Sequence, residues 1–205
     1  IFIAFYMKKN DPTYCFYKQP ALCAHRRKFL GMVTLSTLAL FADPFSTVNA
    51  GYWKNKERKL KLNNLWTQEK ISIVYWREGQ YIDEALQSTN YLLRDWRTGE
   101  VGIIFYQLLD HLVKISEYAG IEANFDVVSG FRSNKTNSWL ANKSEGVAVN
   151  SLHTLGMAID IRHPKILSKD LFITAQKLKL GGTGYYKKSD FVHIDVGPAR
   201  SWINQ

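Results

Sequence analysis

The stretch SLHTLGMAIDIR, residues 151–162, combines a turn with a short strand. Gly156 allows the chain to reverse, and the residues after it have the alternating pattern of a β-strand over 158–162. Successive side chains of a strand point to opposite faces, so Asp160 lies opposite the two isoleucines beside it, which we expect in the core. His153 enters this region from the turn.

A second strand is predicted over residues 191–196, within the stretch SDFVHIDVGP (189–198). If the two strands pair, His193 and Asp160 converge on one side of the sheet. Two imidazoles and one carboxylate suffice for a catalytic zinc, with the fourth position left to water. The spacing alone leaves open the alternative that the histidines only form hydrogen bonds in a folded core.

The flanking sequence mixes strands and helices. The patterns predict a hairpin of residues 60–65 with 71–76, a strand over 125–129, helices over 83–96, 102–119, 135–143 and 169–180, and a loop over 182–186. Gly181 and Gly182 are expected to close the last helix. Because there is no βαβ alternation, the predicted class is α+β, with an antiparallel sheet and flanking helices.

Composition excludes several classes of protein. The 205 residues are 46% hydrophobic and 22% charged, so a packed core is expected rather than disorder. Both cysteines, Cys15 and Cys23, lie in the first fifty residues, which excludes a disulfide scaffold or cysteine-ligated zinc finger after them. The net charge of +9 suits an anionic polymer. No basic motif interleaved with aromatic residues supports nucleic-acid binding.

Residues 1–50 have the features of an export signal. Arg26 and Arg27 precede Phe29, an uncharged run occupies 31–42, and small residues lead to Ala50. This order is typical of a twin-arginine signal, read by the twin-arginine translocase, and we expect cleavage after Ala50. The apolar run is shorter than the ~20 residues needed to cross a bilayer, so no stable membrane span is expected after cleavage. An uncleaved anchor is the alternative. After cleavage, residues 51–205 would form a single domain in the periplasm.

The motifs Ser-x-His-x-x-Gly-x-Ala-x-Asp and Phe-Val-His-x-Asp-x-Gly resemble those of zinc murein peptidases related to D-Ala-D-Ala carboxypeptidases and hedgehog domains. Within that group the chain is similar to exported endopeptidases of the murein endopeptidase K type. The likeness extends to SGFRS (129–133), GTGYY (182–186) and GPARSW (197–202), and covers roughly residues 60–202. It implies a hedgehog/D-Ala-D-Ala peptidase-like fold.

The resemblance implies roles for five residues. His153, Asp160 and His193 would bind one Zn²⁺ per chain, Asp190 would be the general base, and Arg132 would clamp the scissile carbonyl or a substrate carboxylate. Positions three apart in an ideal strand face opposite sides, so Asp190 must lie in a bend before the strand. The alternatives are a carboxylate that caps a turn for Asp190 and a surface salt bridge for Arg132.

Two further residues are expected to support the ligands. Asp195 shares a strand face with His193 and could orient its imidazole. Ser151 opens the first motif and is assigned a similar supporting role.

The predicted function is zinc-dependent hydrolysis of peptidoglycan cross-link peptides in cell-wall remodelling. Two alternatives remain open. One is a non-catalytic, zinc-containing module that binds peptidoglycan, because a fold does not determine a function. The other is a D-amino-acid carboxypeptidase that trims stem peptides.

Overall fold

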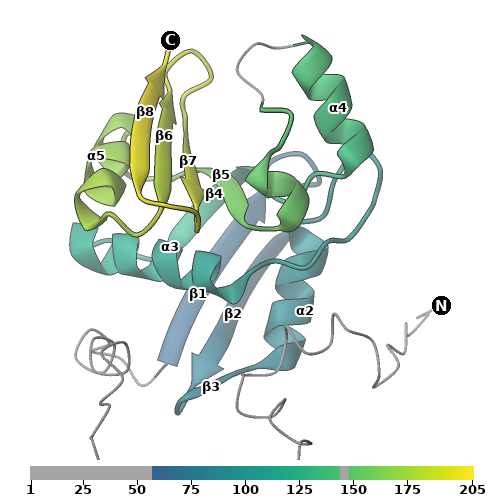
Figure 1. The fold of residues 1–205 in the computed structure, drawn as a ribbon. Helices are drawn as coiled ribbons and strands as arrows, with labels where there is room; N and C mark the ends of the chain where they lie inside the picture. Colours follow the sequence, from purple (N-terminus) through teal and green to yellow (C-terminus); the bar gives the residue numbers. More distant parts are fainter. Residues whose placement is uncertain (1–56, 144–147) are drawn as a thin grey trace, which may run out of the picture. The chain divides into compact units, whose positions relative to one another are not determined.

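The computed structural model describes residues 57–143 and 148–205, which belong to a unit spanning Asn49–Gln205 (Figure 1). Eight strands form one sheet in the order β3-β2-β1-β4-β5-β7-β6-β8. The strands are β1 (Glu57–Asn64), β2 (Lys70–Arg77), β3 (Gln80–Tyr81), β4 (Asn124–Ser129), β5 (Ala158–Arg162), β6 (Gly182–Tyr186), β7 (Phe191–Asp195) and β8 (Arg200–Asn204). The helices are α2 (Asp83–Leu92), α3 (Tyr106–Ala119), α4 (Asn134–Lys143), α5 (Ser168–Leu178) and the short 3₁₀ helix η2 (Leu152–Leu155).

The predicted α+β class is confirmed. The sheet is mixed, however, so the prediction of an antiparallel sheet is wrong. The predicted hairpin of β1 with β2 is present, and β5 pairs antiparallel with both β4 and β7. However, β1 runs parallel to β4, and β6 runs parallel to β8. Helices α2 and α3 lie between β1 and β4 along the chain. The parallel direction of this pair therefore depends on a long crossover connection, which local sequence patterns do not reveal.

The core lies where helices cover the sheet. In β1, Leu60 and Leu62 are buried while the lysines between and beside them are exposed, as the period-two pattern predicts. Helix α3 packs on β1 with a face that includes the buried Leu108 and Leu112. Helix α5 contacts α3, β6 and β7 (Figure 1). Helices α3 and α5 therefore pack on one another and on strands β1, β6 and β7.

Three helix boundaries differ from the predictions by two residues or more. Helix α2 ends at Leu92 rather than at residue 96. Helix α3 begins at Tyr106 rather than at residue 102, because Phe105 is extended, and it ends at Gly120 in the left-handed conformation. Helix α5 ends earlier than expected, at the left-handed Lys179.

The segment predicted as a loop, 182–186, is strand β6. Its glycines sit where another side chain crosses the backbone: a Cβ on Gly184 would collide with the Trp202 indole, and one on Gly182 with the Asp195 carboxylate. Glycine is unfavourable in a strand interior by propensity, which explains the missed strand.

The predicted signal and its cleavage after Ala50 lie outside the described residues. Within the described part, no helix is long and apolar enough to cross a membrane.

Candidate metal centre

Strands β5 and β7 bring two predicted ligands together. They pair so that Asp160 lies directly opposite His193, which confirms the predicted convergence. The neighbouring positions, Ile159 opposite Ile194, are buried on the other face of the sheet. These two strands are therefore covered on both faces, by the apolar core on one and by a polar cluster on the other.

Helix η2 delivers His153 to the same place. Ser151 caps this helix, because its hydroxyl accepts a hydrogen bond from the His153 backbone N–H at 3.4 Å. Gly156 ends it with φ 67°, and a Cβ there would collide with the carbonyl of Ile103. His153 Nδ1 lies 2.7 Å from the Gly130 carbonyl oxygen. A carbonyl can only accept, so Nδ1 carries the proton and Nε2 presents a lone pair.

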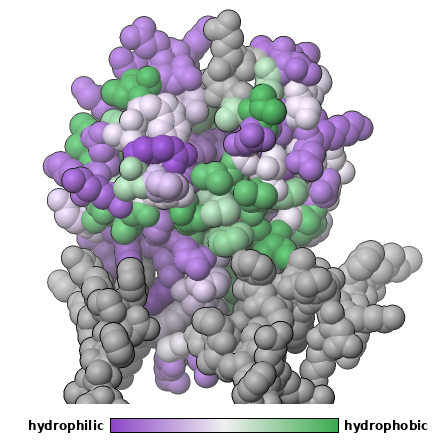
Figure 2. Space-filling model, viewed as in Figure 1, coloured by the Kyte–Doolittle hydropathy of each residue, from purple (hydrophilic) through white to green (hydrophobic). Residues whose placement is uncertain are grey.

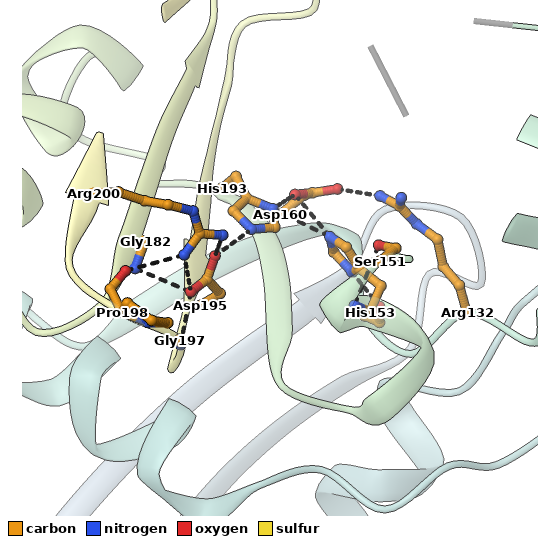
Figure 3. A network of polar contacts seen from close by, with 11 residues as sticks. Arg132, Ser151, His153, Asp160, Gly182, His193, Asp195, Gly197, Pro198 and Arg200 are labelled. Carbon is orange, nitrogen blue, oxygen red and sulfur yellow. Dashed lines mark hydrogen bonds and ion pairs between the residues drawn. The ribbon is translucent and has the colours of Figure 1, made fainter. Parts of the chain in front are cut away.

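Three electron-pair donors meet at one point (Figure 3). His153 Nε2 lies 3.2 Å from Asp160 Oδ1 and 3.2 Å from His193 Nδ1, which is 2.9 Å from the same carboxylate oxygen. The edges of a tetrahedron around a zinc ion measure ~3.4 Å, from metal–ligand bonds of about 2.1 Å. All three side chains are buried. This cluster fits a single divalent cation, and its three atoms are the group that could hold one within the described residues.

The pKa shifts of the three side chains reflect a cluster that favours positive charge. Burial lowers the pKa of His153, which favours the neutral imidazole that a metal requires. Burial alone would raise the pKa of Asp160, but its contacts with His153 and with the Arg132 guanidinium hold it well below its usual value. Burial opposes protonation of His193 too, yet Asp160 and Asp195 outweigh it and raise its pKa. The site therefore attracts positive charge.

Asp195 lies behind His193, as their shared face predicts. Its Oδ2 lies 3.1 Å from His193 Nε2, so that nitrogen is the donor and Nδ1 faces the cluster. Asp195 is fully buried and also accepts hydrogen bonds from Arg200 Nη2 at 2.6 Å and from the Gly182 and Gly197 backbone N–H groups (Figure 3). The imidazole is thus held in one tautomer and one orientation.

The Arg132 side chain bonds to the cluster and does not lie exposed on the surface. Its Nη2 donates to Asp160 Oδ2 at 2.5 Å, and its Nε donates to Ser129 Oγ at 2.9 Å. The side chain is largely buried, so the alternative of a surface salt bridge is wrong. The next residue, Ser133, donates from its N–H and its hydroxyl to the buried Asp95. The Arg132 side chain is therefore held by Ser129 and Asp160, and the backbone that follows it is held by Asp95.

Asp190 lies in the turn before β7, as the strand geometry requires, with φ 49°. Its side chain is exposed and, among the described residues, accepts no hydrogen bond, so it does not cap the turn. Its backbone carbonyl accepts from Arg162 Nε at 2.7 Å and from Ser168 Oγ at 3.0 Å. The carboxylate is outside the three-atom cluster.

A cavity of about 850 Å³ lies beside the cluster, with Asp160 and Arg132 in its wall. Other lining residues, to which sequence reasoning gave no role, are Trp66, Arg97, Arg162, Tyr186 and Lys188. Arg162 lies two positions after Asp160 and therefore shares its strand face, a signal that could have found it.

Replacing Asp195 by asparagine is expected to lower metal affinity about 10- to 100-fold. An amide oxygen is a weaker hydrogen-bond acceptor than a carboxylate oxygen, and the amide can present its nitrogen to His193 instead. Titration against a chromophoric chelator measures this. Asp126→Asn is the control, since Asp126 accepts from Asn63 on the neighbouring strand and does not belong to the cluster. Equal affinities of the Asp195 variant and the parent would show that His193 is oriented without Asp195.

Comparison with known proteins agrees with the motifs. Residues 53–202 match the family model described as peptidoglycan L,D-endopeptidase MepK. The peptidoglycan L,D-endopeptidase MepK of Escherichia coli (strain K12) is 38% identical over 181 residues, covering 87% of this chain and 97% of that protein. A probable peptidoglycan L,D-endopeptidase MepK of Haemophilus influenzae is 35% identical over 148 residues, covering 72% and 80%. No solved structure matches. The chain therefore belongs to the peptidoglycan L,D-endopeptidase MepK family.

Proposed function

We propose that this protein is a zinc-dependent peptidoglycan endopeptidase that hydrolyses cross-link peptides. The observation that carries the proposal is the convergence of His153, Asp160 and His193 beside a cavity. The match to relatives named as peptidoglycan L,D-endopeptidases supports the same bond class. The donor set of two imidazoles and one carboxylate favours zinc, one ion per chain.

The roles proposed for the side chains are those that the family resemblance implies, and their positions support them. A bound Zn²⁺ would polarise the scissile carbonyl and lower the pKa of water. Asp190 would take a proton from the attacking water, because it lies in the turn before β7 between two residues that line the cavity, Ser189 and Phe191, and its exposed carboxylate has no hydrogen bond among the described residues. Arg132 holds Asp160 through one nitrogen, and its place in the cavity wall suits it to stabilise negative charge on the substrate.

Digestion of purified sacculi, with fragments identified by mass spectrometry, tests the function. Once a muramidase has cut the glycan strands of the treated sacculi, endopeptidase activity is seen as conversion of cross-linked muropeptide dimers to monomers. Release of single terminal amino acids alone would favour the carboxypeptidase alternative. If the protein binds both sacculi and zinc but releases no fragments, the binding-module alternative is correct.

The proposed location is the periplasm, because peptidoglycan lies outside the inner membrane and residues 26–50 have the order of a twin-arginine signal. Changing Arg26 and Arg27 together to lysine is expected to stop periplasmic accumulation, since the translocase reads the pair. Cell fractionation with immunoblotting measures this. Normal export of the parent protein in a strain without the twin-arginine translocase would contradict the assignment.

A further inference from the structure

Four cationic side chains line the cavity beside the metal cluster: Arg97, Arg132, Arg162 and Lys188. Two of them are already engaged. Arg132 is paired with Asp160, and Arg162 donates to the backbone carbonyls of Ser189 and Asp190. Within residues 57–143 and 148–205, neither Arg97 nor Lys188 has a carboxylate within ion-pair distance of its side chain. The cavity therefore contains two cations able to receive an anion.

Arg97 differs from Lys188 because it is held in place. Its guanidinium carbon lies 4.2 Å from the centroid of the Trp96 ring and 5.8 Å from that of Trp139. Trp96 in turn stacks on Trp66, with ring centroids 4.7 Å apart and planes 14° apart. Trp66 is anchored by its indole N–H, which donates to the Val128 carbonyl at 2.7 Å. This series of stacked groups fixes the guanidinium before any ligand arrives.

The charge of Arg97 is not compensated locally. Partial burial lowers the pKa of Arg97 and the nearby Arg132 lowers it further, while Asp95 acts in the opposite direction. Asp95 forms no ion pair with the Arg97 side chain, and its oxygens accept hydrogen bonds from Ser133 and from the Arg97 backbone N–H. An anion that enters the cavity therefore meets a prepared, unpaired cation.

We propose that Arg97 is a substrate-binding residue that receives a free carboxylate of the cross-linked peptide in the cavity. The proposal rests on the proposed function and specifies what its substrate must carry. A guanidinium can donate two parallel N–H groups to a carboxylate, whereas an ammonium acts as a point charge. The Trp96 ring lies against the guanidinium, and among the described residues the Arg97 side-chain N–H groups donate no hydrogen bond that would compete with this contact. A neutral carboxamide at the same position would lose the charge-assisted pair.

The test compares a cross-linked peptide with derivatives in which each free carboxylate is singly converted to a carboxamide. We expect the wild-type protein, loaded with zinc, to prefer one acid over its amide about 10- to 100-fold in kcat/KM, mainly through KM. In Arg97→Gln this ratio should collapse toward one. In Arg97→Lys most of it should be lost as well, because the charge remains but the two-pronged geometry does not.

Arg77→Gln is the matched control, since Arg77 is exposed, pairs with Glu57 and does not line the cavity. It should keep the wild-type ratio. Absence of any acid preference in the wild type, or an unchanged ratio in Arg97→Gln, would overturn the proposal. Full retention in Arg97→Lys would overturn the two-pronged contact. Failure of the wild type to cleave any of these peptides or sacculi would instead reject the proposed function.

Discussion

Replacing His153, Asp160 or His193 by alanine is expected to remove most of the bound metal and to abolish peptidoglycan cleavage. The three donor atoms lie 2.9–3.2 Å apart, and within residues 57–143 and 148–205 no fourth group belongs to the cluster to compensate for a lost ligand. Metal analysis of the purified variants measures the loss directly. Circular dichroism separates it from unfolding.

Two further variants separate loss of metal from loss of stability. His163→Gln removes another buried histidine, one that contacts the Glu122 carbonyl and lies outside the cluster, and it should retain one metal ion per chain. For Asp160, alanine would also leave Arg132 as a buried cation without its partner, which costs about 3–5 kcal/mol of stability. Asp160→Asn is therefore made as well, because it preserves the shape of the Asp160 side chain and removes only its charge. Stoichiometric zinc in all three alanine variants would contradict the ligand assignment.

Asp190→Asn is expected to lower the rate of cleavage about 10²- to 10⁴-fold while leaving zinc content and thermal stability near those of the parent. An amide cannot accept the proton of the attacking water at neutral pH. The Asp190 carboxylate is exposed and forms no hydrogen bond within the described part of the chain, so its replacement should not disturb the turn. Muropeptide release under single-turnover conditions, together with binding to sacculi, measures both effects.

Asp170→Asn provides the control, because Asp170 is an exposed aspartate in the first turn of α5 and neither of its sequence neighbours lines the cavity, whereas Ser189 and Phe191 beside Asp190 both do. Its variant should cleave at the parental rate. Full activity of Asp190→Asn with zinc bound would show that another group is the base.

Local sequence patterns were sufficient for the elements that carry the ligands. The period of two in β5 places Ile159 and Ile161 on one face and Asp160 on the other, and the same rule places His193 with Asp195. These predictions succeeded because they depend only on the geometry of a strand. The family motif then supplied the roles that spacing alone left open.

Strand pairing and side-chain partners were decided by tertiary structure. The parallel pairing of β1 with β4 joins segments separated by two helices, and β6 is a strand despite its glycines because Trp202 packs across Gly184. Equally, no sequence pattern shows that Arg132 pairs with Asp160 while Arg97 lies against Trp96 with no ion pair among the described residues. The sequence by itself determined the residue types and the strand faces on which they lie. Only the packed structure decided which charges meet, because such contacts join residues far apart along the chain, and their strength depends on burial that local patterns do not encode.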